Sequence, residues 1–157
     1  MKYNKAEILA ELIQNLNDEL TVIEQASRAA REAATHEESK PEDQYDTRGL
    51  EASYLAGAQA QRAAEIQGNI RTLHSLGALK PSEGKAAIGA IITLAMEETN
   101  STYILLPVGG GVRLSNSITV VTPASQLGKE LTGRKVGDTF ILQLRGQEKE
   151  YELLNIF

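Results

Sequence analysis

Cysteine and tryptophan are absent from this 157-residue chain, and histidine occurs only twice. Without cysteine the chain has no disulfide framework, no thiolate metal site and no cysteine nucleophile. Phenylalanine occurs twice and tyrosine five times, which is too few aromatic rings for a platform that stacks nucleic-acid bases. The lack of cysteine also fits a reducing compartment, and we expect a cytoplasmic protein.

Long apolar runs are also lacking, so we expect no membrane span, and the first residues, MKYNKAEILAELIQNL, are too charged for a signal peptide. The formal net charge is −5, which disfavours free duplex DNA as a partner because phosphate binding needs a basic surface. What the chain does have is 41% hydrophobic residues. That content is enough for the core of one ordinary domain or two small ones.

The first half of the chain carries two series of apolar or small residues at alternating intervals of four and three, which is the spacing of a coiled-coil seam. The first series is Leu9, Ile13, Leu16, Leu20, Ile23, Ser27, Ala30 and Ala34, and the second is Ala52, Ala56, Gln59, Ala63, Ile66, Ile70, Leu73 and Gly77. Pro41 lies between them in the polar stretch EESKPEDQYDTRG, which predicts a loop.

The sizes of the seam residues indicate how the two helices meet. If the chain folds back on itself, Ile13 faces Leu73 and Ala30 faces Ala56, so that large residues meet large ones and small residues meet small ones. This order predicts an antiparallel hairpin within one chain, and therefore a monomer. The alanine-rich part beside the loop is expected to be slim, because small side chains let helices approach closely.

The second half is predicted to be an α+β domain built mainly of antiparallel sheet. Apolar, β-rich runs occur at residues 86–96, 102–108, 117–122, 139–144 and 149–157, and turn residues separate them. The stretch ASQLGKELTG predicts a short helix that ends at Gly133. Residues 76–84 read as a linker, so we expect domains at 1–80 and 81–157.

The loop between the two helices concentrates carboxylates. One interpretation is an ordinary solvated turn in which Asp46 or Thr47 caps the second helix. The other is that Asp43 and Asp46 place hard oxygen ligands near a divalent ion that a partner holds. His36 alone offers little for a transition-metal site. The acidic residues of the loop are Glu37, Glu38, Glu42, Asp43 and Asp46.

The second half also carries an ordered set of motifs. An apolar strand runs into Thr122 and Pro123, a short helix follows with Leu131 and Gly133, then come Val136–Asp138 and a closing strand with Glu150–Glu152. This order resembles the C-terminal domain of the Gre-type transcription elongation factors. In the first half, ASYLAGAQ at residues 52–59 is similar to the start of the second helix of that family's hairpin.

The resemblance implies an FKBP-like second domain that docks at the rim of the secondary channel of bacterial RNA polymerase, with Thr122, Pro123 and Leu127 as the expected docking residues. It also implies that the coiled coil enters the channel. Two carboxylates at its tip would then help the polymerase hold a Mg²⁺ ion and cleave backtracked RNA. On this reading the chain is not itself an enzyme and contacts nascent RNA only indirectly.

The expected tip carboxylates, with catalytic and metal-binding roles only in complex with polymerase, are Asp43 and Asp46. The family pattern at this point is Asp-x-x-Glu, whereas Asp46 here is followed by Thr47, Arg48 and Gly49. Glu42 and Glu51 are therefore alternates. Two further functions stay open: a channel-occupying inhibitor or competitor without cleavage activity, and a coiled-coil adaptor unrelated to polymerase. Prolyl isomerisation is disfavoured, because the second half has few aromatic residues for a pocket wall.

Overall fold

The computed structural model describes residues 3–35, 47–80, 83–144 and 146–157. The chain divides into two compact units, one formed by Ile13–Arg71 and the other by Met1–Leu12 together with Thr72–Phe157. The sequence had placed a boundary at residue 80. The division differs from it because the beginning of the first helix and the end of the second group with the sheet.

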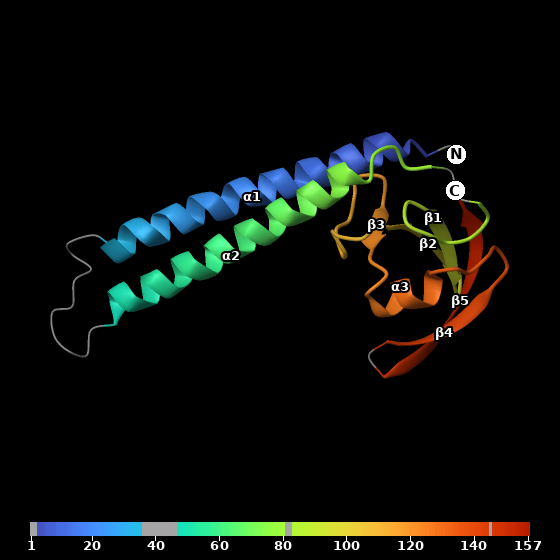
Figure 1. Cartoon of the computed structure of the whole chain (residues 1–157). Coiled ribbons are helices and arrows are strands. Elements are labelled where there is room, and N and C mark those ends of the chain that lie inside the picture. The colour runs from blue at the N-terminus through green and yellow to red at the C-terminus, as the bar shows by residue number, and fades with distance from the viewer. Residues whose placement is uncertain (1–2, 36–46, 81–82, 145) are drawn as a thin grey trace. The chain divides into compact units, whose positions relative to one another are not determined.

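The unit Ile13–Arg71, here called the hairpin unit, consists of parts of two long helices, α1 (Lys5–Thr35) and α2 (Arg48–Ser75) (Figure 1). They run antiparallel, as the seam predicted. Leu16 and Ile66 are buried in this unit, and so are four small residues, Ser27, Ala30, Ala56 and Ala63. The change from large to small along the seam is therefore present in the structure.

The second unit, here called the sheet unit, contains a five-stranded sheet in the order β3-β2-β1-β5-β4. The strands are β1 (Ile91–Met96), β2 (Thr99–Leu105), β3 (Ile118–Val121), β4 (Thr139–Leu144) and β5 (Gln147–Ile156). A short helix, α3 (Gln126–Leu131), lies between β3 and β4 in the chain. The α+β class and the short helix are confirmed.

Three of the strand pairings are antiparallel, but β2 and β3 pair in parallel. The sequence did not predict this pairing. A parallel pair needs a long connection instead of a tight turn, and residues 106–117 supply one. Over these residues the chain leaves the end of β2, loops out and returns beside β2 in the same direction. The backbone N–H of Leu106, just after β2, donates to the carbonyl of Val121 at the end of β3 at 2.9 Å.

The first apolar run of the second half is only partly a strand. Residues 86–90 lie before β1, and Gly89 has a positive φ of 86°. Ala86 and Ala90 are nevertheless buried. An apolar run predicts burial more reliably than it predicts extended backbone.

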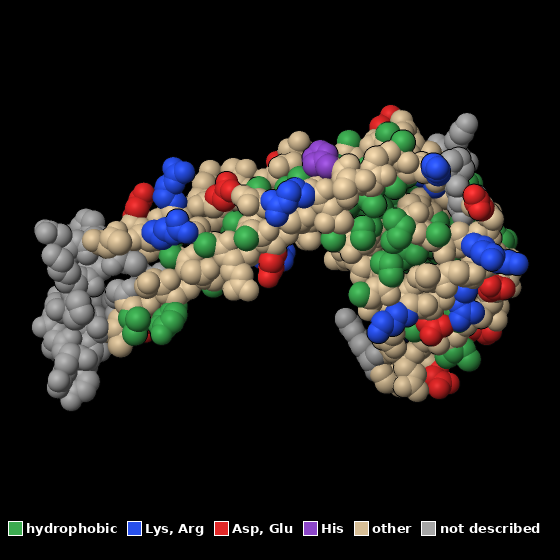
Figure 2. Space-filling view, viewed as in Figure 1, with side chains coloured by type: hydrophobic (Ala, Val, Ile, Leu, Met, Phe, Trp, Pro, Cys, Tyr) green, Lys and Arg blue, Asp and Glu red, His purple; other side chains and the backbone are tan. Residues whose placement is uncertain are grey.

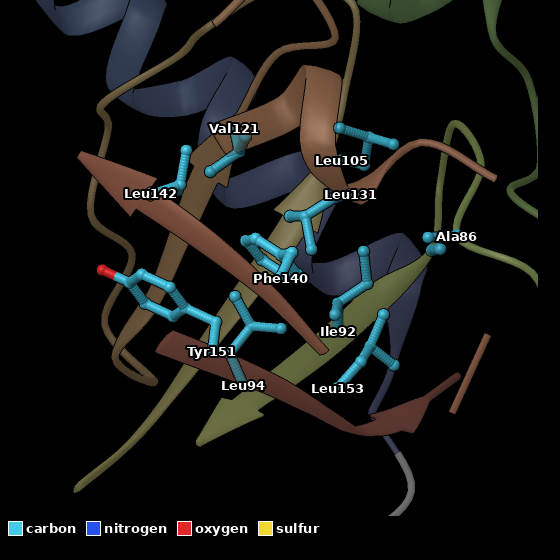
Figure 3. Packing of buried hydrophobic residues seen from close by; sticks show 11 residues of the cluster. Ala86, Ile92, Leu94, Leu105, Val121, Leu131, Phe140, Leu142, Tyr151 and Leu153 are labelled. Atoms are coloured by element: carbon cyan, nitrogen blue, oxygen red, sulfur yellow. The ribbon is translucent and has the colours of Figure 1, made fainter. Parts of the chain in front are cut away.

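The core of the sheet unit lies between α3 and one face of the sheet. Ile92 and Leu94 of β1, Phe140 of β4 and Leu153 of β5 point into it, and Leu131 of α3 covers them (Figure 3). This packing fixes the position of α3 and of the segment that leads into it. No helix in the described part of the chain is both long enough and apolar enough to cross a membrane.

Candidate functional site

The hairpin's loop was the main candidate from the sequence. Glu42, Asp43 and Asp46 fall within residues 36–46, which lie outside the described residues, and so does His36. The structure describes the two helix ends that border this loop, and the alternate carboxylate Glu51 lies on one of them.

Two hydrogen bonds between Thr47 and Glu51 hold the start of α2. The Thr47 hydroxyl donates to Oε1 of Glu51 at 2.9 Å, and the Glu51 backbone N–H donates to the Thr47 carbonyl at the same distance. Since α2 begins at Arg48, Thr47 occupies the cap position, one of the two residues expected there. A carboxylate in the first turn is also favoured by the positive end of the helix dipole. Glu51 therefore has a local structural role.

Apolar side chains project from the first two turns of α2. Leu50 is 56% exposed and Tyr54 is 72% exposed, and the neighbouring Leu55 is exposed as well. In Figure 2 hydrophobic side chains gather at this end of the helix. The sequence did not predict this exposed apolar group. The available signal was a pair of large apolar residues four apart that lies outside the seam.

Small residues bring the two helices of the hairpin unit close together. The Ser27 hydroxyl, which is buried, approaches the carbonyl of Ala56 at 3.4 Å. The distance between packed helices is set by the side chains at their contact, so serine and alanine give a narrow pair. The sequence predicted small seam residues in the part beside the loop, and Ser27, Ala30 and Ala56 are buried there.

Polar side chains join the two helices along their exposed sides. Arg62 Nη2 lies 2.8 Å from Glu19 Oε1, and Gln67 donates through Nε2 to Glu24 Oε1 at 3.2 Å. The hydrogen bonds to Glu19 and then Glu65 raise the pKa of the Arg62 guanidinium. These exposed contacts help to fix the register of α1 against α2, while the buried seam supplies most of the stability.

The expected docking residues Thr122, Pro123 and Leu127 come together where the chain enters α3. The Thr122 carbonyl accepts hydrogen bonds from the backbone N–H of Ser125 at 3.0 Å and from its hydroxyl at 2.7 Å. Ser125 in turn caps α3, because its Oγ accepts from the Gly128 N–H at 3.0 Å. Leu127 packs against the core. All three are only partly exposed, and Thr122 and Leu127 have structural contacts besides any role in docking.

Metal ligation was expected only in complex with a partner. Over residues 3–35, 47–80, 83–144 and 146–157, no group of three or more histidine, aspartate or glutamate side chains is placed to hold a metal ion. Mg²⁺ binding by Asp43 and Asp46 stays a prediction, because both residues lie outside these ranges.

Comparison with known proteins points to transcription factors. No family model matches the chain. It is 24% identical over 159 residues to the transcription elongation factor GreA of Alkalilimnicola ehrlichii, with 98% of each chain covered. It is 28% identical over 129 residues to GreA of Trichlorobacter lovleyi, covering 80% of this chain and 76% of that one.

Among solved structures, the GreA factor homolog 1 (Gfh1) of Thermus thermophilus is similar at 21% identity and a TM-score of 0.40, with 92% of this chain and 94% of that chain covered. The sequence relatives decide the assignment. They show that the chain is a divergent relative of the Gre-type transcription elongation factors, as the motifs in its second half indicated.

Proposed function

We propose that the chain binds bacterial RNA polymerase at the secondary channel and inserts the loop end of its hairpin toward the active site, where it modulates elongation or transcript cleavage. The proposal is supported by the relatives named as transcription elongation factors. It places the chain in the cytoplasm, where it acts as a monomer on the polymerase and contacts the transcript only through that complex.

The observation that carries the proposal is the slim antiparallel hairpin. Its buried seam narrows to serine and alanine between Ser27 and Ala56. A pair of helices with such a seam occupies less width than one packed by leucine and isoleucine. This property suits insertion into a narrow opening.

In the cleavage form of this function, Asp43 and Asp46 contribute carboxylate oxygens to a Mg²⁺ ion that is shared with the polymerase. Carboxylate oxygens are the ligand type that this ion prefers, and a shared Mg²⁺ ion would supply activation of water for hydrolysis. The chain then stimulates a reaction whose catalytic centre belongs to the polymerase, and is not an enzyme alone.

A second form of the function, occupation of the channel without cleavage, is favoured by the start of α2. The described carboxylate there, Glu51, accepts a hydrogen bond from Thr47, while Leu50 and Tyr54 are the side chains that project outward. An apolar surface beside the loop can contact a protein wall but cannot ligate a metal ion. In this form the chain competes with cleavage factors for the channel.

The direct test is a cleavage assay on stalled elongation complexes with a backtracked transcript, purified polymerase and magnesium. For the cleavage form we expect wild type to shorten the transcript and the Asp43→Ala/Asp46→Ala double variant to bind polymerase equally but not to stimulate cleavage. The Glu37→Ala/Glu38→Ala pair is the matched control, because it removes the same charge from the same loop.

The outcomes separate the candidates. Equal cleavage by wild type and by the Asp43→Ala/Asp46→Ala variant rejects the assignment of the carboxylates. Binding without cleavage, combined with displacement of a GreA factor, selects the inhibitor. Failure to retain polymerase in a pulldown rejects both forms and leaves the coiled-coil adaptor.

A further inference from the structure

One edge of the sheet in the sheet unit is formed by β4, and its backbone could pair with a strand of another chain. β4 is the last strand in the order β3-β2-β1-β5-β4. Near its middle, Ile141 is 60% exposed. An exposed apolar strand at the edge of a sheet presents unpaired backbone groups and is a template for association between copies of a protein.

The direction of the backbone groups shows which of them face outward from β4. The Asp138 carbonyl accepts from the Leu153 N–H at 2.9 Å, so it points toward β5. Carbonyl directions alternate along a strand. The carbonyls of Thr139, Ile141 and Gln143 therefore point away from β5, toward the free edge.

Two side chains from outside the strand donate hydrogen bonds to the first and last of these three carbonyls. Arg134 donates through Nη1 to the Thr139 carbonyl at 3.2 Å, and Gln126 donates through Nε2 to the Gln143 carbonyl at 3.3 Å. These contacts lie on either side of Ile141. An incoming strand needs several consecutive edge groups, and here it would have to displace both side chains.

Arg134 is held in this position by further contacts. Its Nη2 donates to Glu130 Oε2 at 2.6 Å, and its guanidinium carbon lies 4.8 Å from the centre of the Phe140 ring. Since the planar guanidinium offers several donors in a fixed arrangement, it can satisfy Glu130 and the strand edge together. Phe140 points into the core (Figure 3), which ties Arg134 to the packed part of the unit.

From this geometry we infer that Gln126 and Arg134 are edge-guarding residues that keep β4 from pairing with β4 of a second copy of the chain. This inference concerns the assembly state and is independent of any role in transcription. It accounts for how the proposed monomer can carry an exposed isoleucine on an edge strand.

The test replaces both guards by methionine, which removes the donors and leaves an unbranched side chain about as long as that of glutamine. For the Gln126→Met/Arg134→Met variant we expect self-association at least about tenfold tighter than for wild type in sedimentation velocity, since two edge contacts no longer compete with pairing. Lys129→Met is the matched control, because it adds an exposed methionine to α3 at a residue that makes neither of the two edge contacts. Adding Ile141→Lys to the double variant is expected to restore the monomer, because a lysine on an edge strand opposes pairing.

Two results overturn the inference: a folded double variant that associates no more than wild type, and association that persists after Ile141→Lys is added. Circular dichroism checks the fold in each case. If loss of the Arg134 contacts unfolds the double variant, the single variant Gln126→Met becomes the test. Gln126 is exposed, and its replacement frees the Gln143 carbonyl at one end of the edge. It must associate more tightly than Lys129→Met, and equal behaviour rejects the role of the guards.

Discussion

Gly128 lets the chain pack tightly at the start of α3, because it has no side chain. A Cβ atom placed on Gly128 would lie 1.9 Å from the carbonyl oxygen of Thr122, which already accepts two hydrogen bonds from Ser125. The requirement is for space, since Gly128 is not among the glycines with positive φ. The sequence shows a glycine inside a short helix, but not the carbonyl that it must avoid.

We expect Gly128→Ala to lower the free energy of unfolding by about 1–3 kcal/mol, the usual cost of overpacking. Gly57→Ala is the matched control, because its added methyl meets nothing within 4 Å in the interior of α2. It is expected to raise stability by about 0.5–1 kcal/mol, since alanine favours helix over glycine. Urea unfolding followed by circular dichroism measures both, and equal stability of Gly128→Ala and wild type contradicts the contact.

Tyr151 makes the stability of the sheet unit depend on pH under alkaline conditions. It is buried and stacks on Phe140, with ring centres 5.4 Å apart. Burial, followed by the nearby Tyr103 and Glu97, raises the pKa of the Tyr151 hydroxyl. The unfolded chain therefore loses this proton at a lower pH than the folded chain. The stabilisation is complete below the ordinary tyrosine pKa of about 10 and is lost as the pH rises through the higher folded value.

We therefore expect Tyr151→Phe to reduce the loss of stability above about pH 10, while it keeps the ring stacked on Phe140. Thermal unfolding measured from pH 8 to pH 11 would show a shallower decline for the variant. Tyr54→Phe, at an exposed position of α2, removes the same phenol as a control. Parallel declines for Tyr151→Phe and wild type would contradict the assignment.

At the scale of elements, the helices could be predicted and the order of the strands could not. The intervals of four and three depend on residues close in sequence, so Ser27, Ala30, Ala56 and Ala63 could be assigned to the seam before the structure was known. The parallel pairing of β2 with β3 depends on the path of residues 106–117. That path is set by long-range bonds such as the one between Leu106 and Val121, and no local pattern encodes it.

One turn of α2 allows the stability contributed by a buried seam residue to be compared with that contributed by an exposed ion pair. Ile66 is fully buried, and we expect Ile66→Ala to cost about 2–5 kcal/mol of stability through lost transfer energy and a cavity. Arg62, one turn away, bonds Glu19 and Glu65 in an exposed position. Arg62→Ala is expected to cost no more than about 1 kcal/mol because solvent screens the pair. Thermal unfolding followed at 222 nm compares them, and a larger effect from Arg62 would reverse this order.

At the scale of the whole molecule, the sequence could not assign the first turns of α1 to the sheet unit. Glu11 accepts hydrogen bonds from the backbone N–H of Ser115 at 2.6 Å and from its hydroxyl at 3.0 Å. Leu12 packs so close to Gly109 that an added Cβ there would lie 3.2 Å from its Cδ2. These contacts join residues about a hundred positions apart, and they were invisible to a reading based on spacing.

The candidate site was predicted as a loop and its carboxylates, and it stays a prediction at Asp43 and Asp46. Around it, the structure adds Thr47 at the cap position of α2, its hydrogen bond to Glu51, and the exposed pair Leu50 and Tyr54. The cap was one of two options open from the sequence. The exposed pair was not predicted, because the spacing of the seam carries no information about the exposure of residues outside it.

The proposed insertion of the hairpin can be tested with a single thiol, because the chain contains no cysteine. Leu50→Cys, exposed at the start of α2, carries a tethered iron chelate whose hydroxyl radicals cut whatever lies nearby, and Val136→Cys in the sheet unit serves as the control. In the complex with polymerase, we expect the probe at residue 50 to cut next to the polymerase active site and the probe at residue 136 not to do so. Cuts from residue 50 that fall only on the outer surface of a bound polymerase would contradict the proposed insertion.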